Sequence, residues 1–177
     1  MSAKIVAVVG PSGAGKDTLM AAACAARPDL RAARRVITRP PDSGGEVFDG
    51  VTEEVFRQRQ AAGDFALSWT AHGLSYGIPW QELEGSGTVL FNASRAVLTE
   101  AQARFPRLRV LLVTAPPEVL AARLARRGRE TAADQAGRIA RAGFALPAGI
   151  RAGLVCNDAD PATGLARFLQ ELDAVRG

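Results

Sequence analysis

Gly10-Pro-Ser-Gly-Ala-Gly-Lys16-Asp17-Thr18 is a glycine-rich stretch between the apolar run Ile5–Val9 and the helix-forming run Leu19–Ala26. A buried strand, a glycine-rich turn and a helix start are the context in which the spacing G-x-x-x-x-G-K indicates phosphate binding. Its three glycines have no Cβ, so the backbone can turn tightly and present successive N–H groups to phosphate oxygens at the positive end of a helix. The stretch therefore predicts a phosphate-binding loop, or P-loop.

The loop supplies most of the predicted ATP-binding residues. These are Gly10, Pro11, Ser12, Gly13, Ala14, Gly15, Lys16, Asp17 and Thr18. Lys16 is also a predicted catalytic residue, because its ammonium group would reach the β- and γ-phosphates as a point charge. At position 17 an aspartate replaces the Ser or Thr whose hydroxyl usually contacts Mg²⁺. A carboxylate is also a good Mg²⁺ ligand, and Thr18 is the nearest hydroxyl, so either Asp17 or Thr18 is expected to contact the metal.

Length and composition predict one globular domain over residues 1–177, since 177 residues with 47% hydrophobic content can build a full core. The sequence contains no apolar stretch long enough to span a bilayer and no signal-peptide pattern, so no membrane partner is expected. Cys24 and Cys156 lie in apolar segments and do not indicate a disulfide framework. Together these features favour a cytoplasmic protein.

The basic residues point to phosphate rather than to nucleic acid. The formal charge is +4, and all but two of the 22 basic residues are arginines, which form bidentate contacts with phosphate. Aromatic residues make up only 6% of the chain and do not alternate with basic runs, as a base-stacking surface requires. A small phosphorylated substrate is therefore expected, and Arg95, at the end of a predicted strand, is a candidate to hold a second phosphate.

Hydrophobic patterning predicts an α/β fold with a mostly parallel sheet flanked by helices. Further strands are predicted at 34–37, 65–70, 74–78, 88–91, 109–114 and 154–156. Further helices are predicted at 52–60, 79–84, 94–105, from 117 to about 127, 130–143 and 161–175. Residues 42–50 read as a surface loop, and the helix at 130–143 has few large apolar residues to anchor it, which makes it a candidate lid.

Several short motifs resemble the guanylate kinase family in order and spacing. They are Thr38-Arg39-Pro40-Pro41, Gly45-Glu46, Gly63-Asp64-Phe65, His72-Gly73-Leu-Ser-Tyr76-Gly77, Arg123-Leu-Ala-Arg-Arg127-Gly128-Arg-Glu130 and Asn157-Asp158. The resemblance covers most of the chain and implies a P-loop kinase core. It also implies an acceptor-binding lobe at about 36–80 and an arginine-bearing lid at about 123–142.

The resemblance assigns roles to individual residues. It implies that Arg39 and Tyr76 hold the phosphate of the acceptor, and that Arg127 and Arg138 close on the transferring phosphoryl group as catalytic residues. It also implies that Asn157 lies beside the adenine of ATP.

The chain differs from guanylate kinases at the positions whose side chains hydrogen-bond the guanine base. The family's guanine-reading glutamate aligns with Leu67, and its Ser or Thr after the Tyr-Gly pair aligns with Ile78. Burying guanine donors against these side chains would leave them unpaired, at roughly 1–3 kcal/mol each. The residues therefore favour an acceptor that is a phosphate ester without guanine.

One branch related to guanylate kinases is similar to the chain in these respects: the ribose 1,5-bisphosphate phosphokinases of phosphonate breakdown. The resemblance lies in the Gly-Lys-Asp loop variant, in Leu67-Ser-Trp69 and in Asn92-x-Ser94-Arg95. It implies transfer of the γ-phosphate of ATP, with Mg²⁺, to ribose 1,5-bisphosphate, a phosphorylated sugar, to give 5-phosphoribosyl 1-diphosphate. The alternatives are a guanylate or other nucleoside monophosphate kinase and a non-catalytic binding module. The sequence leaves the oligomeric state open.

Overall fold

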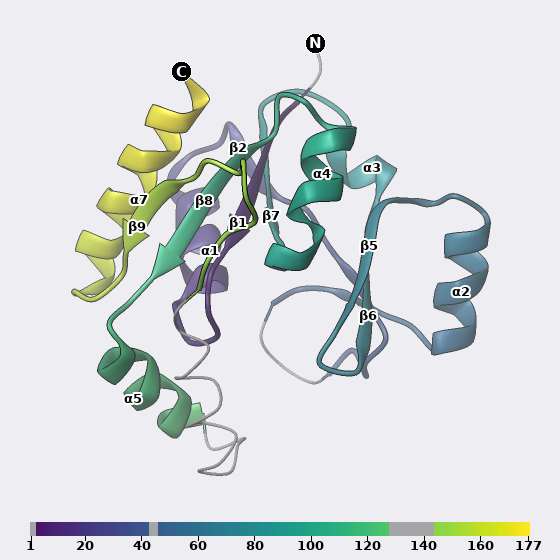
Figure 1. The fold of residues 1–177 in the computed structure, drawn as a ribbon, viewed down its shortest axis with the longest axis horizontal. Helices are drawn as coiled ribbons and strands as arrows, with labels where there is room; N and C mark the ends of the chain where they lie inside the picture. The colour runs from purple at the N-terminus through teal and green to yellow at the C-terminus, as the bar shows by residue number, and fades with distance from the viewer. Residues whose placement is uncertain (1–2, 43–45, 128–143) are drawn as a thin grey trace.

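The computed structural model describes residues 3–42, 46–127 and 144–177. It contains a central parallel sheet with helices on both sides and a second, smaller sheet at one edge of this core (Figure 1). The α/β fold with a mostly parallel sheet flanked by helices, expected from the sequence, is confirmed.

The central sheet has the strand order β2-β7-β1-β8-β9, and all of its pairings are parallel. Its strands are β1 (Lys4–Val9), β2 (Leu30–Ala32), β7 (Thr88–Asn92), β8 (Arg109–Thr114) and β9 (Gly153–Cys156). Parallel strands end at the same edge of a sheet, so β1 delivers the P-loop to the edge where β7 and β8 also end.

The central position of β1 follows from its continuous apolar sequence. Val6 and Val8 pack into the core on one face of the sheet, whereas Ala7 and Val9 pack into the core on the other. All four side chains are fully buried, as expected for a parallel strand that helices cover on both faces.

Two helices cover the Val6 face of the sheet, and others cover the opposite face (Figure 1). The first pair is α1 (Lys16–Ala26) and α7 (Pro161–Arg176), which contribute Leu19, Met20, Phe168 and Leu172 to the core. The opposite face is covered by the short 3₁₀ helix η1 (Arg95–Val97), by α4 (Leu98–Arg104) and by α3 (Trp80–Leu83). Helix α5 (Pro117–Arg127) follows β8 and packs Leu120 into the core on the α1 side.

The second sheet has the order β4-β3-β6-β5 and lies within residues 36–79. Its strands are β3 (Val36–Ile37), β4 (Asp49–Gly50), β5 (Phe65–Ala71) and β6 (Leu74–Pro79). Helix α2 (Glu53–Ala61) begins at Thr52, whose Oγ1 accepts a hydrogen bond from the N–H of Val55 at 3.2 Å, and it packs Phe56 on Phe65. The β5–β6 hairpin turns at His72 and Gly73, both with positive φ, as the sequence indicates.

The predicted elements match the structure closely, with two exceptions. Residues 30–32, where the sequence predicts no strand, form the edge strand β2, because they pair with β7 in the core sheet. Residues 49 and 50, expected to be loop, form β4 against β3. The predicted lid at 123–142 begins in α5, and its helix at 130–143 lies outside the described part of the chain.

None of the helices in the described ranges is both long and apolar enough to cross a bilayer.

A surface network of ion pairs fastens α7 to the segment between α1 and β2. Arg27 and Arg176 both contact Asp29, at 3.0 and 2.9 Å, and Arg27 also contacts Asp173 at 3.2 Å. The hydrogen bonds from Arg27 and then Arg176 lower the pKa of Asp29 to about 2. The last helix is thus connected to the start of β2 by charge as well as by its apolar face.

Because the folded-state pKa of Asp29 is lowered, its contribution to stability is present above its ordinary pKa of 3.8 and is lost as pH falls toward 2. We expect Asp29→Asn to lower the urea midpoint at pH 7, and the difference from the wild type to shrink between pH 4 and pH 2.5. Parallel urea denaturations of the two proteins across this range measure it. A difference that stays constant with pH would contradict the assignment.

Candidate active site

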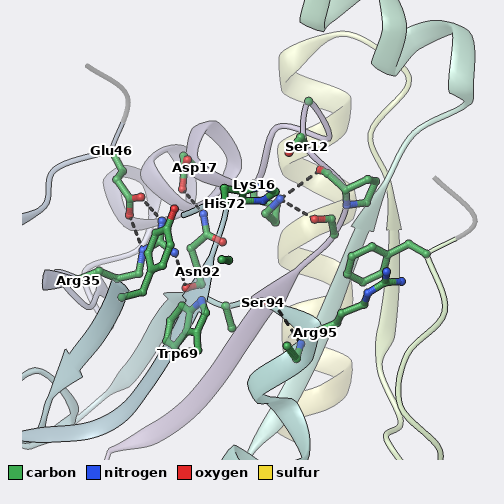
Figure 2. Close-up of a pocket in the computed structure, with 18 of the residues that line it drawn as sticks. Ser12, Lys16, Asp17, Arg35, Glu46, Trp69, His72, Asn92, Ser94 and Arg95 are labelled. Atoms are coloured by element: carbon green, nitrogen blue, oxygen red, sulfur yellow. Dashed lines mark hydrogen bonds and ion pairs between the residues drawn. The ribbon is translucent and has the colours of Figure 1, made fainter. Parts of the chain in front are cut away.

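A pocket of about 550 Å³ opens at the carboxyl edge of the central sheet (Figure 2). The P-loop forms one wall, with residues 10–13 and 15–17 lining it, and the β5–β6 hairpin forms the opposite wall. The end of β7 and the start of η1 form the floor between them, through residues 92–96. Segments from three distant parts of the sequence therefore meet around one cavity.

The P-loop has the backbone conformation that its glycines permit. Gly13 and Gly15 have φ values of 85° and 89°, in the region where a side chain is strained, and Gly15 is the residue at which α1 begins. Lys16 folds back over the loop, and its Nζ donates to the carbonyl oxygens of Gly10 and Pro11 at 2.7 and 3.2 Å. The lysine therefore lies at the phosphate-binding surface, within the pocket.

The carbonyl groups of the loop are held from the side away from the pocket. Asn157 Nδ2 donates to the Ala14 carbonyl at 2.8 Å, and Arg123 donates to the Gly13 and Ala14 carbonyls at 3.2 and 3.3 Å. Arg123 also donates to the carbonyl of Asn157 at 2.7 Å, which connects the two residues. A Cβ on Gly15 would lie 2.6 Å from Asn157 Nδ2, so this position requires glycine for space as well as for φ.

The turn that carries Asn157 is fixed by its own charged residues. Arg167 donates to Asp158 at 2.7 Å and to the Cys156 carbonyl at 2.9 Å, and its hydrogen bond holds the pKa of Asp158 below the ordinary value. Asp160 caps α7, because its carboxylate accepts from the N–H of Thr163 at 3.0 Å. These bonds set the position from which Asn157 reaches the loop.

Asn157 is buried and does not line the pocket, in contrast to most of the other predicted ATP-binding residues. Its observed role is to brace the loop, and contact with adenine stays a prediction. Ala14 likewise lies in the core below the loop.

The two candidate metal residues share one hollow, and Asp17 also lines the main pocket. Asp17 is exposed and lines both the main pocket and a second hollow of about 880 Å³ between α1 and residues 32–34. Thr18 lines only the second hollow. Asp17 Oδ1 accepts a hydrogen bond from Asn92 Nδ2 at 2.7 Å. No group of three or more Asp, Glu, His or Cys residues suited to a metal occurs among the described residues, so Asp17 is available mainly as a single carboxylate beside a polyphosphate.

The candidate acceptor residues lie across the pocket from the P-loop or on its floor. Arg39 and Tyr76 come from the second sheet and its loops, and Arg95 comes from η1. The Arg39 guanidinium lies 4.1 Å from the centre of the Phe48 ring, and that of Arg95 lies 4.8 Å from the Phe144 ring. Stacking of this kind holds a guanidinium in one plane.

Sequence reasoning missed Arg35 and the contacts it makes at the hairpin wall of the pocket. Arg35 is buried and forms an ion pair with Glu46, with Nε 3.0 Å from Oε2, and its guanidinium lies 4.9 Å from the Tyr76 ring centre (Figure 2). Tyr76 stacks in turn on Trp69, with ring centres 5.5 Å apart. Arg35 adjoins the quoted Thr38-Arg39 motif, but no spacing rule connects it to Glu46 or Asn92.

Leu67 and Ile78 do not face the pocket, contrary to the expectation that they would contact a bound base. Both are buried in the core behind the second sheet, at 1% and 0% exposure. The pocket-lining residues of β5 begin two positions later, at Trp69. Position 67 carries no carboxylate, as the sequence shows, and the side chains of this hairpin that line the pocket include the stacked pair Trp69 and Tyr76.

The other two predicted catalytic residues, Arg127 and Arg138, lie at or beyond the end of the described range 46–127. Arg127 is the last residue of α5, and its side chain is not described. Arg138 lies outside the described residues. Their roles stay predictions.

The chain matches no protein-family model. It is 51% identical over 174 residues to the ribose 1,5-bisphosphate phosphokinase PhnN of Ruegeria sp. (strain TM1040), which covers 97% of this chain and 90% of that one. The chain belongs to the ribose 1,5-bisphosphate phosphokinase family.

Another family member agrees with this assignment, and a solved structure shares the fold. The ribose 1,5-bisphosphate phosphokinase PhnN of Acidiphilium cryptum (strain JF-5) is 47% identical over 95% of this chain and 91% of its own. The crystal structure of guanylate kinase from Anaplasma phagocytophilum superposes with a TM-score of 0.69 over 98% of this chain and 86% of that chain. Its sequence identity is 16%, so this second likeness concerns the fold.

The hydrogen bond from Asn157 to the P-loop predicts the effect of removing this side chain. Asn157→Ala leaves the buried Ala14 carbonyl with only the longer bond from Arg123, and we expect a loss of about 1–3 kcal/mol in the free energy of unfolding. ATP and GTP binding should weaken by the same factor, because the loop is loosened and no base contact is removed. Urea denaturation and nucleotide titration measure the two effects.

Gln102→Ala is the matched control, since this exposed amide donates to the Pro106 carbonyl far from the loop. A variant that loses affinity for ATP but keeps its affinity for GTP would instead place Asn157 at the adenine.

Proposed function

We propose that the chain transfers the γ-phosphoryl group of ATP to the 1-phosphate of ribose 1,5-bisphosphate, which yields 5-phosphoribosyl 1-diphosphate and ADP. The observation that carries this proposal is the single pocket in which the P-loop faces Arg39, Tyr76 and Arg95. It occurs in a chain whose relatives at 47–51% identity are named ribose 1,5-bisphosphate phosphokinases.

The P-loop side of the pocket is suited to the nucleotide. The start of α1 places a positive helix end at the loop, and Lys16 adds a full positive charge beside it. When a nucleotide binds, its phosphates offer Lys16 stronger acceptors than the Gly10 and Pro11 carbonyls. Lys16 would then hold the β- and γ-phosphates during transfer.

The chain also fits Mg²⁺ as the companion of ATP. Mg²⁺ in kinases is commonly held by one or two carboxylates together with substrate phosphates, and Asp17 offers an exposed carboxylate directly after Lys16. Asp17, with Thr18 as the nearest hydroxyl, would hold the ion, and the ion would supply positive charge to the β- and γ-phosphates.

The opposite wall is suited to a compact acceptor with two phosphates. Arg39 and Arg95 come from separate segments, so each can bind its own phosphate group. Tyr76 pairs in register with Ile37, two residues before Arg39, and adds a phenolic hydroxyl to the lining of the same pocket. We assign Arg39 and Tyr76 to one phosphate of the sugar and Arg95 to the other.

The reaction needs no general base from this chain. A phosphate monoester has a second pKa near 6, so the attacking oxygen is largely ionised at neutral pH. That oxygen forms a bond to the γ-phosphorus of ATP, and the bond from this phosphorus to the β,γ-bridging oxygen breaks to release ADP. His72 lines the pocket at the hairpin turn, and the proposal gives it no catalytic role. Arg127 and Arg138 are proposed to stabilise the charge on the transferring group.

The cytoplasmic location and the expectation of no nucleic-acid partner remain predictions from the sequence.

The proposal is tested by ADP formation from Mg-ATP with ribose 1,5-bisphosphate and, in parallel, with GMP, each against a blank without acceptor. We expect turnover with the sugar bisphosphate and none above the blank with GMP, because the buried Leu67 stands where guanylate kinases carry the glutamate that pairs with the donors of guanine. Turnover with GMP alone would identify a nucleoside monophosphate kinase. No turnover with either acceptor would favour a binding module.

The assignment of Arg39 predicts a selective effect on the acceptor. Arg39→Ala should raise the KM for ribose 1,5-bisphosphate by roughly tenfold or more, as expected for the loss of a hydrogen bond between charged groups, and leave the KM for ATP within about twofold. Arg39→Lys is the matched control, because it keeps the charge and loses only the planar fork. Initial-rate kinetics in both substrates measure the effect, and a change confined to the KM for ATP would remove Arg39 from the acceptor site.

A further inference from the structure

Asn92 is the polar residue that connects the floor of the pocket to the P-loop. It ends β7, and its Cα pairs in register with Val8 of β1, two residues before the loop starts. Its side chain is buried, and Nδ2 donates to Asp17 Oδ1 at 2.7 Å (Figure 2). A residue of one strand thus fixes the carboxylate that follows Lys16.

Asn92 is itself held from the side of the second sheet. Its backbone carbonyl accepts a hydrogen bond from Arg35 NH1 at 3.3 Å. Arg35 is fixed in turn by its ion pair with Glu46 and by the Tyr76 ring beneath its guanidinium. The backbone of Asn92 is therefore fixed in place, and its side-chain amide contacts Asp17 from a fixed position.

Asp17 needs such a support, because it is exposed in the first turn of α1 and lines both hollows. An exposed aspartate rotates freely about its side-chain bonds, whereas a metal ligand must hold one orientation. Within the described part of the chain, the Asp17 side chain accepts this hydrogen bond at Oδ1, so Oδ2 is the oxygen that would bind a cation. Asparagine suits the partner position, since its amide donates to a carboxylate without adding a second negative charge.

We propose that Asn92 is a positioning residue that holds the Asp17 carboxylate in the orientation in which it binds the divalent cation of the ATP complex. This inference rests on the proposed function, because it assigns Asp17 to the cation. It names a residue outside the phosphate-binding motif as part of the metal site.

The test is a double-variant cycle on metal binding at equilibrium. Binding of Mn²⁺ to the enzyme–ADP complex is measured, from the loss of the free Mn²⁺ electron paramagnetic resonance signal, for the wild type, Asn92→Ala, Asp17→Asn and the double variant. We expect Asn92→Ala to weaken Mn²⁺ binding about tenfold when Asp17 is present, the lower end of what loss of an outer partner of a metal ligand causes. In the Asp17→Asn background the same change should alter binding less than twofold.

Control variants separate positioning from a merely structural role. Gln102→Ala removes an amide far from the pocket and should leave Mn²⁺ binding unchanged. Asn92→Leu keeps the side-chain volume and removes the donor, and it replaces Asn92→Ala in the cycle if the alanine variant does not fold. ADP affinity in the presence of a chelator should stay the same in Asn92→Ala and in Asn92→Leu.

Each outcome decides the proposal. An equal loss of Mn²⁺ affinity in both backgrounds would mean that Asn92 acts on the fold and not through Asp17. Unchanged Mn²⁺ affinity in Asn92→Ala would overturn the positioning role, and unchanged affinity in Asp17→Asn would remove Asp17 from the metal. None of these results bears on whether the wild type turns over ribose 1,5-bisphosphate, so the proposed function stands or fails separately.

Discussion

The candidate active site depends on hydrogen bonds that two side chains outside the pocket donate to the backbone of the P-loop. Arg123 and Asn157 together bind the carbonyls of Gly13 and Ala14, on the side of the loop away from the pocket. A loop with positive φ at Gly13 and Gly15 turns these carbonyls away from the normal strand and helix partners, and a buried carbonyl without a partner is costly. The two side chains remove that cost and so keep the loop in its phosphate-binding shape.

The same constraint explains the arrangement of the C-terminal third of the chain. Asn157 reaches the loop only because β9 is the edge neighbour of β8 and because its carboxyl end is fixed by Arg167 and Asp158. Gly164 of α7 is needed as well, since a Cβ there would lie 2.5 Å from Asn157 Oδ1. Helix α7 therefore supports the nucleotide site through close packing, although none of its residues lines the pocket.

The second sheet supplies the other half of the site with a different balance of forces. Its pocket face combines a buried ion pair, Arg35 with Glu46, with stacked rings of Tyr76 and Trp69. A buried pair of charges contributes little net stability, but it fixes geometry when its hydrogen bonds are satisfied. Arg35 thereby connects the hairpin wall of the pocket to the carbonyl of Asn92, and Asn92 in turn connects to Asp17 of the P-loop.

The sequence by itself determined the P-loop, the parallel core and most element boundaries. These features follow from local rules: glycine spacing around Lys16, the apolar run of β1, and the cap at Thr52. Strands β2 and β4 were missed because three and two residues form strands only when a neighbouring edge supplies the hydrogen bonds. The resemblance to guanylate kinases also placed Leu67 at the position that contacts the base. In the structure, the packing of β5 directs this side chain into the core.

Only the tertiary structure decided which side chains act together. Arg35, Glu46 and Asn92 lie far apart in the sequence, as do Asn157 and Ala14, and no periodicity connects them. Their contacts arise where the ends of parallel strands meet a second sheet, so their partners are set by topology and not by local propensity.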